Sequence, residues 1–155
     1  QIKEAGFDAF VLVQFEGGQS PLVNVPTNER GEPDWSKVPT NYENEPLRRH
    51  YPYEKAMEFI ELFRKAYPKT AIINYALPNE HNYEKTFKFT VPYLTYYLLA
   101  KKEECKGAVT IDSSLQHLIA GVKKCVVIWG HSLPQSFGYA YNENIIQNCN
   151  RDDIF

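Results

Sequence analysis

Short apolar runs alternate with helix-like segments along most of this chain of 155 residues, and this alternation constrains the fold more than any other feature. Apolar side chains at nearly every position indicate strands buried on both faces, as in a parallel sheet covered by helices. Four runs have this character: Ala9–Phe15, Thr70–Tyr75, Gly107–Ile111 and Cys125–Trp129. The sequence therefore predicts an α/β domain in which a parallel sheet carries helices on both faces.

Three segments between these runs are predicted to be helices: Tyr53–Tyr67, Val91–Glu104 and Ser113–Val122. In the first, apolar residues recur at helical spacing, and Pro52 and Pro68 stand where a helix begins and ends. We also expect a short strand at Phe87–Thr90, whereas the segment from Ile145 onward is only weakly patterned. In folds of this class, ligands bind beyond the carboxyl ends of the strands.

A long polar stretch from Gln19 to about Pro52 follows the first predicted strand. Prolines at positions 21, 26, 33, 39 and 46 interrupt it and prevent a long strand or helix. Loops of this length in compact domains are usually functional or disordered. The chain begins with Gln1 instead of methionine, so we expect it to be a segment of a longer protein.

Composition narrows the classes of function. The formal net charge of -2 provides no basic surface for a polyanion, which argues against nucleic acid as a partner. Cys105, Cys125 and Cys149 are odd in number and none are closely spaced, so we expect free thiols in a reducing cytosol. No cluster of acidic or histidine residues predicts a metal site, and no apolar run has the length of a membrane span.

The segment from Gly107 to Tyr139 carries the residues with the clearest chemical meaning. Asp112 comes where a strand is expected to end, Ser113 and Ser114 come where a helix begins, and a histidine follows one turn later. A helix start offers unpaired N–H groups and a positive dipole potential that suit phosphate. The same residue types also serve as ordinary helix caps, so the pattern alone leaves both interpretations open.

The stretch Asp112–Gly121 (DSSLQHLIAG) resembles a signature of the heptosyltransferase-like glycosyltransferases, family 9. That signature has Asp, then Ser or Thr, Gly, two variable residues, His, an aliphatic residue and a run of Ala. The segment Arg48–Lys55 is similar to the basic segment that opens the family's first helix, and Pro134–Tyr139 lies where a further family segment falls. The resemblance runs in the same order from about residue 9 to residue 140. Ser114 replaces the family's Gly and Tyr51 replaces its Trp, which indicates a divergent member.

The resemblance implies the C-terminal, donor-binding half of a GT-B glycosyltransferase, with a Rossmann-like fold over residues 1–155. Such a domain binds a nucleotide diphosphate sugar as substrate, without a metal or another cofactor. It serves inverting transfer to a glycan or lipid-linked acceptor such as lipopolysaccharide. The N-terminal domain of the same enzyme would be a further partner and would supply the catalytic base. We expect a cytoplasmic protein, or one peripheral to the bacterial inner membrane when it is full-length.

The resemblance also implies roles for individual residues. Ser113 and Ser114 would bind the diphosphate, and Arg49, with Arg48 as its substitute, would reach the same phosphates through its forked donors. Asp112 would orient the helix start or contact the sugar. The adjacent arginines are equally well explained as a solvated charged patch.

Further residues are expected around the nucleotide sugar. His117 would brace the site, and Glu80 would accept hydrogen bonds from the ribose, as acidic residues do in such folds. A plain surface glutamate explains Glu80 equally well. Gln14, Gly17 and Gly18 follow the first predicted strand and would line the cleft.

Other functions remain open from the sequence alone. A sugar-nucleotide epimerase or another GT-B transferase would keep the phosphate site and differ in nucleotide base and sugar. A non-catalytic module that holds a nucleotide or a protein partner fits the lack of a base in this chain. A response-regulator-like domain would need an acidic cluster after the first strand, where Glu16 is the single acid. A dinucleotide enzyme would need the pattern GxGxxG after a strand, and the chain has none.

Overall fold

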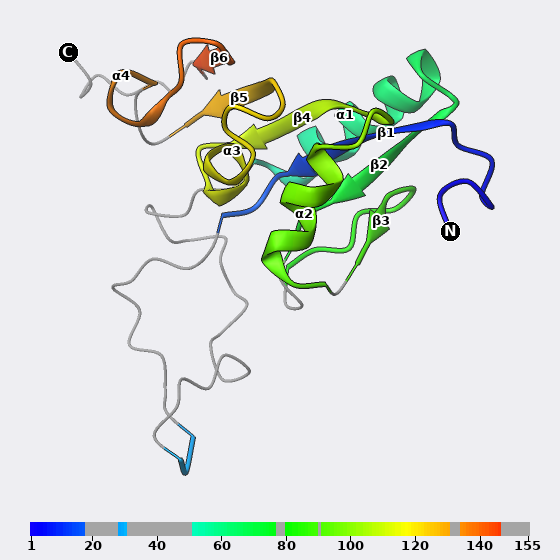
Figure 1. Cartoon of the computed structure of the whole chain (residues 1–155), viewed down its shortest axis with the longest axis horizontal. Helices are drawn as coiled ribbons and strands as arrows, with labels where there is room; N and C mark the ends of the chain where they lie inside the picture. The colour runs from blue at the N-terminus through cyan, green and yellow to red at the C-terminus, as the bar shows by residue number, and fades with distance from the viewer. Residues whose placement is uncertain (18–27, 31–50, 77–79, 90, 131–133, 147–155) are drawn as a thin grey trace.

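The computed structural model describes residues 1–17, 28–30, 51–76, 80–89, 91–130 and 134–146. Its strands form one parallel sheet in the order β3-β2-β1-β4-β5-β6 (Figure 1). The strands are β1 (Ala9–Gln14), β2 (Thr70–Asn74), β3 (Phe87–Lys88), β4 (Cys105–Ile111), β5 (Cys125–Trp129) and β6 (Glu143–Ile146). The helices are α1 (Tyr53–Ala66), α2 (Tyr93–Ala100), α3 (Ser114–Leu118) and α4 (Pro134–Phe137). The predicted α/β class and the parallel sheet are confirmed.

The strand order changes direction between β1 and β4. From β1 the chain adds β2 and β3 on one side, then returns to place β4, β5 and β6 on the other side (Figure 1). Val13 pairs with Val109 and Gln14 with Thr110, so β1 and β4 lie side by side up to their carboxyl ends. This Rossmann-like order places a topological switch point at those two ends, where ligands of such sheets bind.

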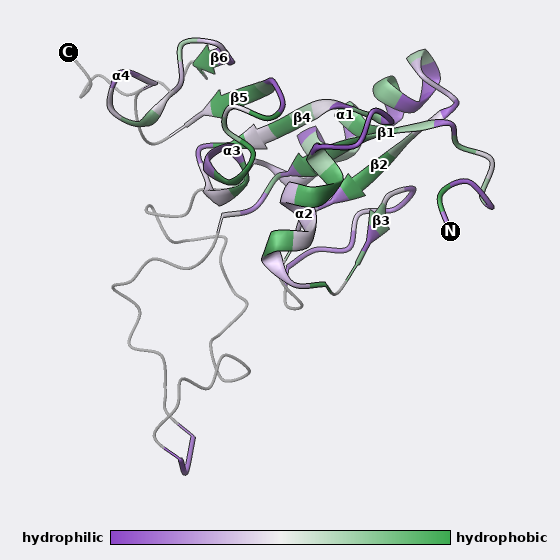
Figure 2. Cartoon of the chain, viewed as in Figure 1, coloured by the Kyte–Doolittle hydropathy of each residue, from purple (hydrophilic) through white to green (hydrophobic). Residues whose placement is uncertain are grey.

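Alternate residues of β1 belong to two separate core clusters, because successive side chains of a strand point to opposite faces. Leu12 joins a cluster with Tyr96 of α2 and Leu115 of α3. Val13 joins a second cluster with Ile60 of α1. Each of these side chains is at most 2% exposed. The hydrophobic colouring of β2 and β5 in Figure 2 shows the same concentration of apolar residues in the sheet. The β1 and β2 strands are therefore buried on both faces, as their apolar composition predicts.

Two helices are several residues shorter than predicted. The α2 helix runs from Tyr93 to Ala100. Residues 101–104 form turns that connect it to β4, which begins at Cys105. The α3 helix ends at Leu118, four residues before the predicted end, and Gly121 follows in a turn at φ 75°. A backbone position with positive φ is most easily occupied by glycine, and such a position commonly ends a helix.

The β6 strand and the α4 helix were not predicted. The β6 strand lies at the edge of the sheet, and most of its side chains are exposed, so it lacks a buried apolar pattern. Asn144 within it accepts a hydrogen bond from Trp129 Nε1 at 2.9 Å. This contact helps to fix β6 against β5.

Two cysteines lie in the core. Cys105 and Cys125 are free and buried, and Cys149 lies outside the described residues. Burial raises the pKa of the Cys125 thiol to about 12, with a smaller contribution from Cys105. Both described thiols therefore act as small apolar core residues. Within the described ranges, no helix is long and apolar enough to cross a bilayer.

Candidate functional site

Gln14 joins the carboxyl end of β1 to the first turn of α3. Its side chain is 2% exposed. The amide nitrogen donates to Ser113 Oγ at 3.0 Å and to the carbonyl oxygen of Glu16 at 2.9 Å. The amide oxygen accepts from the backbone N–H of Leu115 at 3.0 Å. Ser113 makes no capping hydrogen bond with its own side chain, so Gln14 supplies the acceptor that a capping residue normally provides.

A second pair of buried polar side chains belongs to the same segment: Asp112 precedes α3 and Gln116 lies within it. Asp112 is 3% exposed and Gln116 is fully buried. Gln116 Nε2 donates to Asp112 Oδ1 at 3.0 Å. Gln116 Oε1 finds no hydrogen-bond partner among the described residues. A buried polar group without a hydrogen bond is costly, so such an acceptor calls for an explanation.

Ser114 is the first residue of α3 and lies between two tyrosines. Tyr93 Oη donates to the carbonyl oxygen of Ser114 at 2.9 Å. Burial raises the pKa of Tyr75, and a hydrogen bond with the Ser114 side chain opposes this rise. The two tyrosine rings meet edge to face, with their centroids 5.6 Å apart. Tyr93 of α2 and Tyr75, which follows β2, therefore both interact with Ser114 at the start of α3.

His117 lies one turn further along α3, and its side chain is exposed. Its Nδ1 lies 3.1 Å from the Oη of Tyr139, and the two rings meet edge to face. This contact ties α3 to the segment that follows α4. Gly138 stands beside it, where an added Cβ would lie 2.5 Å from the carbonyl oxygen of Pro134, so only glycine fits there.

The other predicted site residues fall in different places. Gly17 is buried just beyond β1. Glu80 is partly buried, and its carbonyl oxygen accepts from Lys88 Nζ at 2.7 Å. Gly18, Arg48 and Arg49 lie outside the described residues. The structure thus brings Gln14, Asp112, Ser113 and Ser114 together at the switch point, with His117 on the same short helix. No prediction from the sequence placed Gln14 as the link between them.

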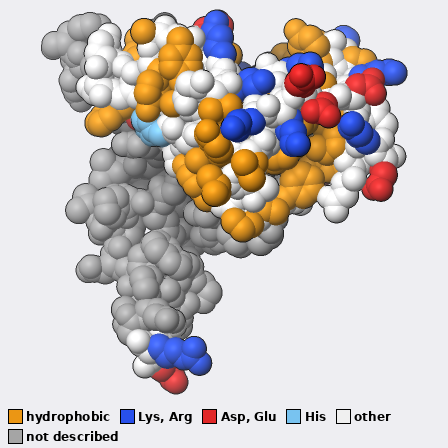
Figure 3. Space-filling view, viewed as in Figure 1, with side chains coloured by type: hydrophobic (Ala, Val, Ile, Leu, Met, Phe, Trp, Pro, Cys, Tyr) orange, Lys and Arg blue, Asp and Glu red, His pale blue; other side chains and the backbone are white. Residues whose placement is uncertain are grey.

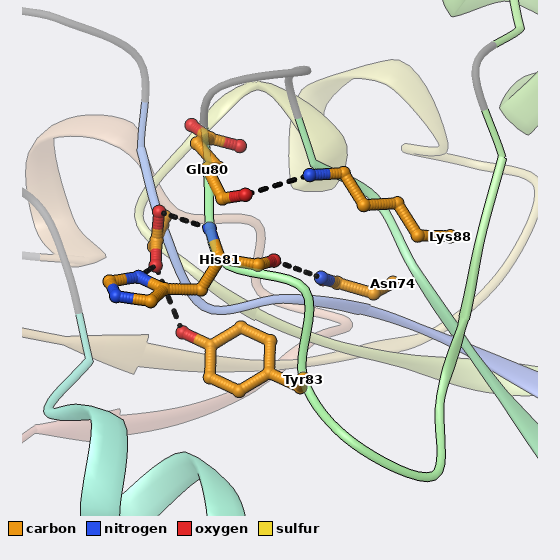
Figure 4. A network of polar contacts seen from close by, with 6 residues as sticks. Asn74, Glu80, His81, Tyr83 and Lys88 are labelled. Atoms are coloured by element: carbon orange, nitrogen blue, oxygen red, sulfur yellow. Dashed lines mark hydrogen bonds and ion pairs between the residues drawn. The ribbon is translucent and has the colours of Figure 1, made fainter. Parts of the chain in front are cut away.

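A polar network that was not predicted lies at the same edge of the sheet (Figure 4). Glu16 follows β1, and its side chain is only 11% exposed. One carboxylate oxygen, Oε1, contacts His81 Nδ1 and accepts from Tyr83 Oη at 3.1 Å. The other oxygen, Oε2, accepts from the backbone N–H of His81 at 3.3 Å. Glu16 and His81 are 65 residues apart, so no local spacing could have revealed the pair.

Buried groups hold this network in place. Asn74, which ends β2, is 1% exposed and donates to the carbonyl oxygen of His81 at 3.3 Å. Tyr83 is 2% exposed, and burial with the nearby Glu16 charge raises its pKa. The Tyr83 ring stacks on Tyr53, the first residue of α1, at a centroid distance of 5.3 Å. The network therefore joins the ends of β1 and β2 to the start of α1.

None of the three comparisons with known proteins gave a significant match. They covered protein-family models, curated proteins and solved structures.

An apolar groove elsewhere in the molecule is separate from this site. It lies between the N-terminal segment and α2, where hydrophobic side chains gather in Figure 3. Asp8, Lys102 and Glu104 also line it, which places it at the amino ends of β1 and β4. The polar residues described above lie at the opposite, carboxyl ends. Within the described ranges, no group of three or more His, Cys, Asp or Glu residues is placed to hold a metal ion.

Replacing Gln14 by alanine is expected to lower the free energy of unfolding by about 1–3 kcal/mol, because the buried N–H of Leu115 loses its acceptor. Urea unfolding measures this change. Gln135→Ala is the matched control, since Gln135 is exposed in α4, and should change the free energy by less than about 0.5 kcal/mol. Equal small effects of both variants would show that Gln14 does not hold α3.

Proposed function

We propose that this chain is the donor-binding half of a GT-B glycosyltransferase that binds a nucleotide diphosphate sugar at the switch point between β1 and β4. The observation that carries the proposal is the position of Asp112, Ser113 and Ser114. These residues, which carry the sequence resemblance, follow the carboxyl end of β4, where Gln14 of β1 donates a hydrogen bond to Ser113 Oγ. Rossmann-like sheets bind nucleotides at this place.

The chemistry of the residues fits a diphosphate. Hydroxyl groups and a helix start offer donors to phosphate oxygens. One such donor, the N–H of Leu115, is already taken by Gln14. The ligand would therefore rely on Ser113 and Ser114. In this proposal, Arg48 and Arg49 add charge-assisted hydrogen bonds to the phosphates.

The remaining parts of the proposal concern the rest of the nucleotide sugar and the whole enzyme. Glu80 contacts the ribose, and His117 braces the start of α3 through Tyr139. Helices cover both faces of the sheet, as in one half of a GT-B enzyme. A second domain faces this edge and binds a glycan or lipid-linked acceptor, such as lipopolysaccharide, for inverting transfer. The full-length enzyme works in the cytoplasm or at the inner membrane.

Thermal unfolding in the presence of candidate nucleotides tests this function. ADP, UDP, GDP and CMP are compared, each with and without an attached sugar. A nucleotide diphosphate that binds is expected to raise the melting temperature by about 5–10 °C at a concentration one hundred times its Kd. The monophosphate should give a smaller shift because it lacks the second phosphate. A melting temperature unchanged by every nucleotide would contradict the proposal.

A further inference from the structure

We propose that Glu16 and His81 form an acid–base pair in which His81 accepts the proton of the hydroxyl that attacks the nucleotide sugar. This inference rests on the proposed function and extends it, because the sequence resemblance implied that another domain supplies the base. The pair comes from the described residues alone, and its two members follow β1 and β2 at the carboxyl edge of the sheet. Figure 4 shows the polar network around His81.

The contact between the two side chains fixes which nitrogen of His81 carries its proton. An ionised carboxylate only accepts hydrogen bonds, so Nδ1 donates to Glu16 and the neutral ring leaves Nε2 as a proton acceptor. The side chain of Glu16 is 11% exposed, whereas that of His81 is 63% exposed. The carboxylate is thus sheltered while the imidazole faces solvent. A base oriented by a third group in this way is the arrangement that nucleophile activation requires.

Several contacts keep the imidazole in this orientation. Glu16 also accepts a hydrogen bond from the backbone N–H of His81, and the Asn74 side chain donates one to the carbonyl oxygen of His81. Tyr83 Oη donates to the same carboxylate, which fixes the carboxylate from a second side. The ring of Tyr53 lies 5.2 Å from the imidazole, centroid to centroid. A surface ion pair between two flexible side chains would lack these constraints.

The pair lies next to the proposed diphosphate site. Gln14 Nε2 donates both to the carbonyl oxygen of Glu16 and to Ser113 Oγ. Two residues along an extended chain span about 6.6 Å, so Glu16 follows Gln14 closely at the same edge. Glu16, which holds His81, and Ser113 thus share the Gln14 amide at the carboxyl edge of the sheet.

The reaction step balances with these groups. The attacking hydroxyl oxygen forms a bond to the anomeric carbon, and its proton passes to His81 Nε2. The bond from that carbon to the diphosphate oxygen breaks, and the electron pair leaves with the diphosphate. Glu16 stabilises the imidazolium that forms, and the imidazolium then returns its proton to solvent. Water can serve as the hydroxyl, in which case the products are free sugar and nucleotide diphosphate.

The test measures release of nucleotide diphosphate from the nucleotide sugar that binds most tightly, with water as the acceptor. His81→Ala is expected to lower the release rate by about 100-fold to 10,000-fold, and added imidazole should restore part of it. Glu16→Gln should lower the rate at least tenfold, because the neutral amide no longer stabilises the imidazolium. The Kd for the nucleotide sugar should stay within about threefold in both variants. Asn82→Ala and Glu84→Gln are the controls, because both residues are exposed in the same segment.

A second measurement examines the pair without any substrate. The ¹⁵N chemical shifts of His81 should show a protonated Nδ1 and an unprotonated Nε2 in the neutral ring, and Glu16→Gln should shift this tautomer balance. The proposal is overturned if Nε2 carries the proton, if His81→Ala releases diphosphate at the unchanged rate, or if the chain binds the nucleotide sugar and releases none. These results leave the donor-binding function standing. Failure to bind any nucleotide sugar would instead remove the proposed function and this inference together.

Discussion

Replacing Ser114 by aspartate is expected to abolish nucleotide binding while the fold stays intact. The added carboxylate would lie where the diphosphate is proposed to sit. Two unit charges 4 Å apart repel each other by about 1–4 kcal/mol, depending on the local dielectric, and a diphosphate carries more than one charge. The Kd should therefore rise by roughly 100-fold or more. The fold should survive, because an acidic residue in the first turn of a helix is favourable.

Isothermal titration with the nucleotide selected by thermal unfolding measures this effect. Ser136→Asp is the matched control, since Ser136 is an exposed serine in α4 and receives the same charge. The control should bind the nucleotide as the unaltered chain does. If Ser114→Asp and Ser136→Asp bind equally well, the diphosphate does not lie at the start of α3.

Replacing Leu12 by alanine is expected to lower the free energy of unfolding by about 2–5 kcal/mol. Leu12 is fully buried in the central strand of the sheet, within the cluster that includes α2 and α3. Its truncation loses the transfer free energy of the side chain and leaves a cavity. A loss of this size is a large share of the stability of an ordinary domain.

Urea unfolding followed by circular dichroism gives the value. Leu62→Ala is the control, because Leu62 lies on α1 with 61% of its surface exposed. That change should alter the free energy by less than about 0.5 kcal/mol. If Leu12→Ala lowers the free energy of unfolding as little as the control does, Leu12 does not pack in the core cluster with α2 and α3.

The central strands could be predicted from the sequence because burial on both faces leaves an unbroken apolar run. The β5 strand has the predicted bounds, Cys125–Trp129, and α1 differs from its prediction by one residue. The β6 strand could not be predicted, since an edge strand with exposed side chains has no such run. The early end of α3 depends on a turn at Gly121, where the apolar pattern continues past the helix.

The site was predictable only where its residues are neighbours in the sequence. Asp112, Ser113 and Ser114 follow one strand directly, so strand end and helix start could be placed from the pattern. Gln14 was expected to line a cleft, but its hydrogen bonds with Ser113 and Leu115 depend on β1 lying beside β4. The pair of Glu16 and His81 arises only because β1 and β2 are adjacent in the sheet. Pairings between distant segments are set by topology, which local patterns do not encode.

Binding of a nucleotide diphosphate at the carboxyl ends of β1 and β4 can be tested directly. Titration of the ¹⁵N-labelled chain with the selected nucleotide, followed by amide ¹H–¹⁵N spectra, locates the ligand directly. We expect the largest shifts at residues 112–117 and 14–17. Shifts concentrated in residues 1–10 and in α2, where the apolar groove lies, would contradict it.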